Sequence, residues 1–169
     1  RQDNLSHYQD LLTALLNKQN CMIFASYSNT DSQGNQMNEL LESVAAKYPD
    51  RFVLKPSFGG KMYFSLLRQV DFIIGNSSSG LTEAPAFHCT SINVGQCQKG
   101  RLVADSVINC GYEQAQIEQA IARALSPEQA SLTRTSSSHY GGGEVSNRIL
   151  EVLAQLDYTR LLPKKFVDR

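Results

Sequence analysis

The sequence predicts an α/β fold in which a mostly parallel sheet lies between two layers of helices. Short apolar runs alternate along the 169 residues with stretches that repeat apolar positions every three or four residues, a pattern typical of βαβ units. The apolar runs are continuous, as in parallel strands that are covered on both faces. Because βαβ crossovers are right-handed, the connecting helices cover both faces of the sheet, and we expect a three-layer αβα architecture.

The first half of the chain is predicted to hold two such units. Asn4 can cap a helix, and the apolar positions that follow it share one helical face: Leu5, Tyr8, Leu12, Leu15 and Leu16. A continuous apolar run at residues 21–25 predicts a strand, and the polar residues 26–35 predict a loop. Residues 37–48 have helical spacing that a proline ends, and residues 52–54 predict the next strand.

The second half continues the alternation. Its predicted elements are, in order, a helix at 63–70, a strand at 72–74, a helix that starts in residues 75–80 and runs towards Phe87, strands at 91–94 and 107–109, and helices at 117–125 and 145–156. The dipeptide Ser126-Pro127 stops the first of these two closing helices. Residues 126–138 are polar and predict a linker.

The composition excludes several classes of protein. The 16 basic and 16 acidic side chains cancel, whereas nucleic-acid-binding proteins usually carry a basic excess. Apolar residues make up 41% of the chain, which is too many for a disordered segment. No apolar run reaches the length of a membrane span. We therefore expect a folded domain with no nucleic-acid and no membrane partner.

The cysteines and histidines form no metal-binding or catalytic pattern. Four cysteines are present: Cys21, Cys89, Cys97 and Cys110. They form no C-x-x-C pair and have no zinc-ligand spacing to a histidine, so we interpret them as free thiols of a cytoplasmic protein. His7, His88 and His139 stand in contexts typical of structural or solvated side chains, and we expect no metal and no cofactor.

The segment after the strand at 72–74 is the strongest candidate for a binding site. Open parallel sheets bind ligands beyond the carboxyl ends of their strands, and here the turn Gly75-Asn76-Ser77-Ser78-Ser79-Gly80 leads into a helix. Free N–H groups at a helix start, serine hydroxyls and glycines suit a phosphate or diphosphate. The turn contains no lysine, so it is not a Walker-type phosphate loop. The alternative is that Ser78 or Ser79 only caps the helix.

Glu83 follows this turn within the first part of the predicted helix. A carboxylate that points away from a bound diphosphate can accept hydrogen bonds from two adjacent ribose hydroxyls. Glu83 is therefore predicted to bind a ribose. The alternative is an acidic residue that only interacts favourably with the helix dipole.

These residues resemble those of a known family. The serine turn continues into Glu83-Ala84-Pro85 and Phe87, and further matching segments stand in order at 92–95, 98–101, 106–110, 140–149 and 163–166, with 29–31, Gly34 and 57–67 upstream. The ordered set resembles the hydrolysing UDP-N-acetylglucosamine 2-epimerases of sialic-acid-type sugar synthesis. It spans nearly the whole chain but only the C-terminal half of that family's length.

The chain departs from the family pattern at two places. Phe87-His88-Cys89-Thr90 stands where the family usually has Phe-Gly-x-Pro, and Gln96-Cys97 stands where an Asp-Arg pair is usual. Cysteine supplies neither the charge nor the hydrogen-bond donors of arginine. Lys99 and Arg101 are the nearby cations that compensate, unless they are ordinary solvated side chains.

The resemblance implies one half of a glycosyltransferase-B type architecture, in which two Rossmann-like domains enclose the substrate. Residues 1–169 would form the C-terminal nucleotide-binding domain, with residues 143–169 as its closing helix and tail. The N-terminal domain, which holds the family's acid/base carboxylates and catalytic histidine, would be absent, so no catalytic residue is expected in this chain. The implied partners are a UDP-sugar and that missing domain, and the full-length protein is expected to be a homo-oligomer.

The resemblance also implies which residues bind UDP: Asn29, Phe58, Tyr63, Ser77, Ser78, Ser79, Gly80, Glu83 and Arg101. Ser77 and Ser78 would contact the diphosphate, and Glu83 would bind the ribose. Phe58 would lie beside the uracil, and Tyr63 would pack on the ring unless it is a core aromatic residue. Asn29 would face the cleft near the sugar or the phosphates.

By resemblance, the whole enzyme abstracts a proton from C2 of the sugar and eliminates UDP in an anti sense. Water then adds to a 2-acetamidoglucal intermediate, and N-acetylmannosamine is released. The contribution expected of this half is electrostatic stabilisation of the departing UDP, and the fragment alone is expected to be inactive. Two alternatives stay open, a hydrolysing 2-epimerase acting on a UDP-diacetamido-trideoxyhexose and a non-catalytic nucleotide-sugar-binding module.

Overall fold

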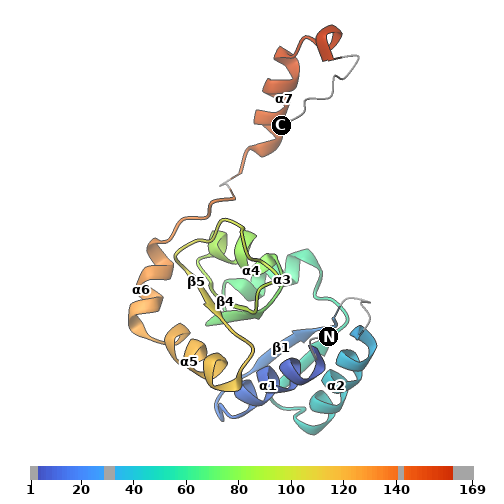
Figure 1. The fold of residues 1–169 in the computed structure, drawn as a ribbon, viewed down its shortest axis with the longest axis vertical. Helices are drawn as coiled ribbons and strands as arrows, with labels where there is room; N and C mark the ends of the chain where they lie inside the picture. Colours follow the sequence, from blue (N-terminus) through green and yellow to red (C-terminus); the bar gives the residue numbers. More distant parts are fainter. Residues whose placement is uncertain (1–3, 29–32, 141–142, 162–169) are drawn as a thin grey trace.

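The computed structural model describes residues 4–28, 33–140 and 143–161 (Figure 1). Its elements in chain order are α1 (Asn4–Leu16), β1 (Ile23–Ser26), α2 (Gly34–Lys47), β2 (Phe52–Lys55), α3 (Gly59–Leu67), β3 (Phe72–Gly75), α4 (Ser79–Thr82), the 3-10 helix η1 (Ala84–Phe87), β4 (Thr90–Val94), β5 (Val107–Cys110), α5 (Gln114–Ala124), α6 (Pro127–Thr135), α7 (Val145–Gln155) and the 3-10 helix η2 (Tyr158–Leu161). Each predicted strand is present within two residues of its expected bounds.

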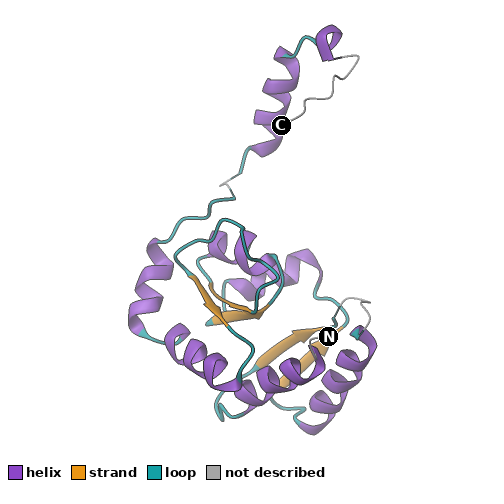
Figure 2. Ribbon diagram, in the orientation of Figure 1, coloured by secondary structure: helices purple, strands orange, loops and turns teal. Residues whose placement is uncertain are grey.

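All strand pairs in the described part of the chain are parallel (Figure 2). β1 pairs with β2, and Ile23 lies opposite Phe52. β4 pairs with β3 on one side and with β5 on the other, so that Ile92 lies opposite both Ile74 and Ile108. The predicted parallel arrangement is confirmed.

α1, α2 and α5 cover one face of the strands. Leu15 of α1 packs in a cluster with Ile92 of β4 and Ile117 of α5. Leu12, also on α1, packs in a second cluster with Leu41 of α2. Burial of one such side chain stabilises the fold by about 1.5–3 kcal/mol. The amphipathic spacing that predicted these helices therefore reflects their contact with the strands.

The opposite face is covered by α3 and by the short helices after β3. Leu67, Ala84 and Cys89 form a buried cluster there, and Ile73 of β3 packs against it. Burial raises the pKa of the Cys89 thiol to about 11, so that this thiol stays protonated and behaves as a small apolar side chain. Helices thus cover both faces of the parallel strands, and the predicted three-layer αβα class is confirmed.

The predicted linker at 126–138 is wrong, because most of it forms α6. Ser126 caps this helix by accepting a hydrogen bond from the backbone N–H of Gln129 at 3.2 Å, and Pro127 occupies its first turn. The buried positions of α6 are polar, Gln129 and Thr133, so hydrophobic periodicity gave no signal. The dipeptide that ends α5 also starts α6.

The single helix predicted after β3 is also wrong. The structure has α4 and η1 on either side of Glu83. Pro85 lacks the backbone N–H that a continuing α-helix would use, and its ring clashes with the preceding turn. The break places Glu83 at the junction of two short helices rather than inside one helix.

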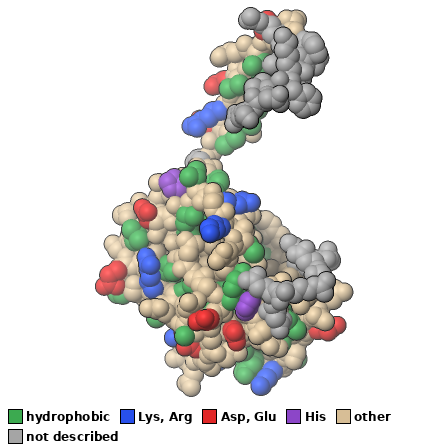
Figure 3. Space-filling model, viewed as in Figure 1, with side chains coloured by type: hydrophobic (Ala, Val, Ile, Leu, Met, Phe, Trp, Pro, Cys, Tyr) green, Lys and Arg blue, Asp and Glu red, His purple; other side chains and the backbone are tan. Residues whose placement is uncertain are grey.

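α7 stands apart from the strands (Figure 1), and its described side chains are all exposed. Its apolar stripe is present as predicted, and Val145, Ile149, Val152 and Leu153 line a shallow groove along it. Hydrophobic atoms are visible on this helix in Figure 3. Tail residues 162–169 lie outside the described residues, and with them the predicted match at 163–166.

Within the described ranges, no helix has the length and apolar character needed to cross a bilayer. All four cysteines are described, and all are free thiols. The cytoplasmic location expected from them stays a prediction.

His88 adopts a left-handed backbone conformation with φ 52° and ψ 37°. This conformation costs a residue with a side chain about 1–2 kcal/mol, and His88 stands where glycine is usual in the family resembled. His88→Gly is expected to raise the free energy of unfolding by about 0.5–1 kcal/mol, because the entropy of glycine in the unfolded chain offsets part of the relief. Urea denaturation of the two proteins measures the difference.

Ala86→Gly is the matched control, since Ala86 lies two residues earlier in η1 and has no positive φ. This change is expected to lower stability by about 0.5–1 kcal/mol. If His88→Gly also lowered stability, the 3.4 Å contact between His88 Nδ1 and the carbonyl oxygen of Thr133 would outweigh the backbone strain.

Candidate functional site

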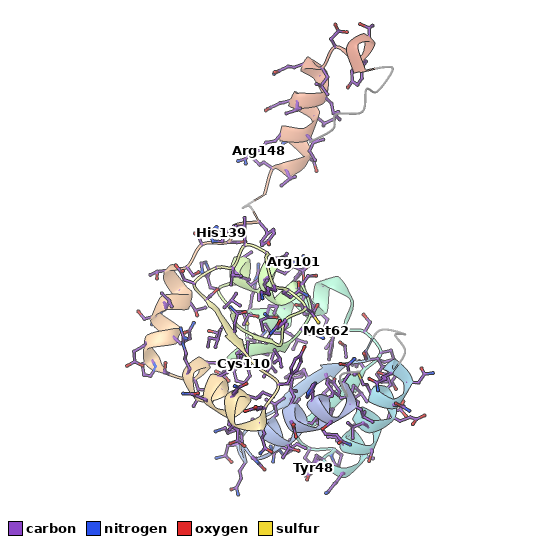
Figure 4. All side chains as sticks on the ribbon, in the orientation of Figure 1. Tyr48, Met62, Arg101, Cys110, His139 and Arg148 are labelled. Atoms are coloured by element: carbon purple, nitrogen blue, oxygen red, sulfur yellow. The ribbon has the colours of Figure 1, made fainter. Side chains whose placement is uncertain are left out.

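Two loops meet beyond the carboxyl ends of β3 and β4. Gln98, in the loop after β4, donates a side-chain hydrogen bond to the backbone oxygen of Asn76 at 2.7 Å. Asn76 Nδ2 in turn lies 3.9 Å from the sulfur of Cys97. Figure 4 labels Arg101, which is in the loop after β4, and Tyr48, which precedes β2 at the amino end of the strands. The two residues lie far apart.

Two glycines shape the serine turn. Gly75 has a φ of +154°, a conformation that disfavours any other residue. Gly80 is buried, and a Cβ atom at this position would lie 2.5 Å from the hydroxyl oxygen of Ser91 on β4. The turn therefore lies against the sheet at a distance that only glycine permits.

The hydroxyl protons of Ser77 and Ser78 make no hydrogen bond within the described residues. Ser78 is the N-cap residue of α4, but its side chain makes no capping hydrogen bond. Ser77 Oγ accepts a long hydrogen bond from the backbone N–H of Ser79 at 3.4 Å. Within the described residues, neither hydroxyl donates a hydrogen bond to the protein. The alternative that Ser78 only caps the helix is therefore not supported by its contacts.

Ser79 connects Tyr63 to Glu83. Its hydroxyl donates to Glu83 Oε2 at 2.5 Å and also bonds to the Tyr63 hydroxyl. Because Ser79 uses its own proton on the carboxylate, Tyr63 is the donor to Ser79. This chain of three side chains links α3 to the junction of α4 and η1, and no described residue forms a hydrogen bond with Glu83 Oε1.

Tyr63 has features of both roles considered for it. Its ring packs against the buried cluster of Leu67 and Cys89, as a core residue would, while its hydroxyl reaches Ser79. Burial raises the pKa of Tyr63, and the nearby charge of Glu83 acts in the same direction. The phenol is therefore neutral at physiological pH, and its O–H group donates a hydrogen bond to the Ser79 hydroxyl.

Three predicted site residues remain, and no described contact joins them to the Tyr63–Ser79–Glu83 chain: Phe58, Arg101 and Asn29. Phe58 precedes α3 and contacts Phe24 of β1 edge to face, with a distance of 6.4 Å between ring centroids. Arg101 is exposed in the middle of the loop between β4 and β5. Asn29 lies outside the described residues. The structure thus brings together Ser77, Ser78, Ser79, Gly80, Glu83 and Tyr63.

Two polar residues of this region were missed by the sequence analysis. Asn93, 5% exposed on β4, donates to the side chain of Asn109 at 2.8 Å. Its own Oδ1 and the Oε1 of Gln98 are buried and have no hydrogen-bond partner in the described ranges. The alternation of Ser91 and Asn93 with apolar residues on β4 was the available signal, because it marks a polar side on a central strand.

A shallow cavity of about 210 Å³ lies at the other end of the sheet, near Asp71 and Thr90, which precede or begin β3 and β4. Parallel sheets bind ligands at the carboxyl ends of strands, so this cavity is not the candidate site. Among the described residues, no three acidic, histidine or cysteine side chains are grouped to hold a metal ion.

Comparisons with known proteins show which family the sequence of this chain is similar to. A sequence model of the UDP-N-acetylglucosamine 2-epimerases matches residues 1–154. The GDP/UDP-N,N'-diacetylbacillosamine 2-epimerase (hydrolyzing) of Campylobacter jejuni is 30% identical over 98% of this chain and 44% of its own length. The UDP-N-acetylglucosamine 2-epimerase of Neisseria meningitidis is 31% identical over 86% of this chain and 38% of its own length.

Solved structures agree on the fold. A Listeria monocytogenes crystal structure described as a UDP-N-acetylglucosamine 2-epimerase superposes with a TM-score of 0.71 at 14% identity, over 99% of this chain and 46% of that one. A second structure described by the same enzyme name gives 0.64 at 16% identity, over 95% and 43%. The chain therefore spans less than half the length of the relatives that it matches.

Proposed function

The chain belongs to the UDP-N-acetylglucosamine 2-epimerase family, and from that premise we propose that it is the UDP-binding half of a hydrolysing sugar-nucleotide 2-epimerase. The observation that carries the proposal is the serine turn, where the Ser77 and Ser78 hydroxyls donate to no other described residue. Two hydroxyl donors beside the backbone N–H groups at the carboxyl end of β3 suit a diphosphate. Glu83, held by Ser79, then accepts from the ribose hydroxyls.

In this role the chain stabilises a leaving group. As the bond between the sugar C1 and the UDP oxygen breaks, negative charge grows on the diphosphate. Hydroxyls and N–H groups that are already oriented towards it lower the barrier, and loss of one such donor typically costs about 10²–10³ in rate. The groups that move the C2 proton and supply water come, on this proposal, from the remainder of the full-length protein.

The direct test is a titration of the chain with UDP, followed by NMR or calorimetry. Wild-type chain is expected to bind UDP with a dissociation constant in the millimolar range or below. Ser78→Ala is expected to weaken binding about 10-fold, because a hydrogen bond to a charged group contributes about 1.5–3 kcal/mol.

Ser137→Ala is the matched control, since Ser137 is an exposed serine of another serine triplet, outside the candidate site. It is expected to leave UDP affinity unchanged. Absence of UDP binding at millimolar concentration, or an equal loss in both variants, would contradict the proposal.

A second candidate substrate has specific support. Two curated relatives, from Campylobacter jejuni and Legionella pneumophila, are described as hydrolysing 2-epimerases of N,N'-diacetylbacillosamine nucleotides. The full-length protein should therefore be assayed with UDP-N-acetylglucosamine and with a UDP-diacetamido-trideoxyhexose. If the protein turns over only UDP-N-acetylglucosamine, the UDP-diacetamido-trideoxyhexose is excluded as its substrate. If it releases UDP from neither sugar nucleotide, the result supports a non-catalytic binding module.

A further inference from the structure

The three serines of the Gly75–Gly80 turn differ in what their hydroxyls do. Ser77 Oγ only accepts, from the backbone N–H of Ser79 at 3.4 Å, and the side chain of Ser78 makes no capping bond. Within the described residues, Ser79 alone of the three donates its hydroxyl proton, to Glu83 Oε2 at 2.5 Å. The triplet therefore contains two hydroxyls with a proton to offer and one whose proton is already bonded.

The same accounting of protons applies to the Tyr63 hydroxyl. A hydroxyl carries a single proton, and because Ser79 donates its proton to Glu83, the Tyr63 hydroxyl donates to Ser79 Oγ. Towards a diphosphate, both hydroxyls would present only oxygen lone pairs, which repel an anion. Their hydrogen bonds end instead at the carboxylate of Glu83.

The spacing of Ser79 and Glu83 explains why their side chains meet. The two residues stand four positions apart at the two ends of α4, and residues at this spacing lie on the same face of a helix. The backbone N–H of Glu83 donates to the carbonyl oxygen of Ser79 at 3.0 Å. Main chain and side chains therefore join the same pair, and the carboxylate is held within one helical turn.

α3 packs against the chain on both sides of Glu83. Before Glu83, the Tyr63 hydroxyl bonds to Ser79. After it, the Phe64 ring stacks on the Phe87 ring of η1 with 5.0 Å between the ring centroids. The Tyr63 ring also packs against the buried cluster beneath α3. Because packing fixes this ring, its hydroxyl supports Ser79 from a fixed position, as the groups behind a binding residue must.

A carboxylate held in this way has one oxygen to offer a ligand. Ser79 bonds to Oε2 of Glu83, and no described residue bonds to Oε1. A side chain that is already ordered loses less conformational entropy on binding than a free one. Hydrogen bonds to a charged acceptor are also stronger than those between neutral groups. The orientation of Glu83 therefore has a large effect on its affinity for a pair of ribose hydroxyls.

We propose that Ser79 and Tyr63 are positioning residues, whose hydroxyls orient Glu83 for the ribose and make no contact with the diphosphate. The inference rests on the proposed function, in which Ser77 and Ser78 donate to the diphosphate and Glu83 accepts from the ribose. The serine triplet is then divided between two parts of the nucleotide. Preference for a ribonucleotide depends on two hydroxyls that do not touch it.

Affinities for UDP and for 2′,3′-dideoxy-UDP, measured by calorimetry on the 169-residue chain, test this division. The second ligand keeps the diphosphate and lacks both ribose hydroxyls. Ser79→Ala is expected to weaken UDP binding about 5- to 10-fold and to leave the affinity for 2′,3′-dideoxy-UDP within about twofold. Ser78→Ala is the matched control in the same triplet, and it is expected to weaken the binding of both ligands by the same factor.

Tyr63→Phe keeps the packed ring and removes only the hydroxyl. It is expected to weaken UDP binding about 2- to 5-fold, less than Ser79→Ala because it acts through Ser79, and to leave 2′,3′-dideoxy-UDP binding unchanged. Tyr8→Phe is its control, since Tyr8 is another half-buried tyrosine on a helix, packed against the cluster of Leu12 and Leu41. Ser79→Thr keeps a hydroxyl and is expected to retain most of the preference for UDP, which identifies the hydroxyl rather than local packing as the cause.

An equal loss for the two ligands in a folded Ser79→Ala variant would overturn the inference, because Ser79 would then donate to the diphosphate. Unchanged affinity for both ligands in Ser79→Ala and Tyr63→Phe would overturn it as well. Circular dichroism checks that each variant is folded, and Tyr63→Phe decides the question if Ser79→Ala does not fold.

These results leave UDP binding by the wild-type chain intact, so the proposed function stands even where the inference fails. Absence of UDP binding by the wild-type chain contradicts the proposed function itself, and the inference is then overturned with it. The two failures are therefore distinguishable.

Discussion

Gly80→Ala is expected to lower the free energy of unfolding by about 1–3 kcal/mol, the usual cost of forcing an extra carbon into a packed region. The new methyl group would lie 2.5 Å from Ser91 Oγ, and Ser91 is only 2% exposed on β4. Either the Ser91 side chain moves within the core or the serine turn moves away from the sheet. Urea denaturation measures the loss of stability.

The double variant Gly80→Ala/Ser91→Ala identifies the cause. Without the hydroxyl, the nearest atom to the new methyl group is the Cβ of residue 91, at an ordinary contact distance of 3.8 Å, so most of the lost stability should return. Gly60→Ala is the matched control, because its methyl group would meet the Phe64 ring only at 3.9 Å. A double variant no more stable than Gly80→Ala would contradict the close approach of turn and strand.

Glu83→Gln is expected to weaken UDP binding about 10- to 100-fold if the carboxylate holds the ribose, since hydrogen bonds to a charged group contribute about 1.5–3 kcal/mol. The substitution keeps an oxygen that can accept from the Ser79 hydroxyl, so the local structure is retained. It also removes a negative charge near the diphosphate, an effect that acts in the opposite direction.

Comparison of UDP with 2′-deoxy-UDP separates these two effects. The wild-type chain should discriminate between the two ligands, and Glu83→Gln should discriminate less, because charge repulsion is the same for both. The pKa of Tyr63 should fall in the variant, since the charge of Glu83 raises it. Tighter binding of both ligands by Glu83→Gln would mean that Glu83 only repels the diphosphate.

Much of the fold followed from local patterns. Short segments rich in apolar residues predicted the strands, and the resulting parallel pairing is confirmed for β1 with β2 and for β3, β4 and β5. The failures have local reasons as well. α6 buries Gln129 and Thr133, so its helix start was readable only from Ser126-Pro127 and not from hydrophobicity. Pro85 divided the helix after β3.

The sequence by itself determined the order of the strands and of most helices, the hydroxyl-rich turn after β3, and the family. These are properties of residue spacing and of short motifs, and they do not depend on long-range contacts. The tertiary structure alone decided that Ser79 joins Tyr63 to Glu83 and that Gly80 lies against Ser91. Such features depend on which distant segments pack together, and packing is set by the whole layer of strands and helices rather than by any one segment.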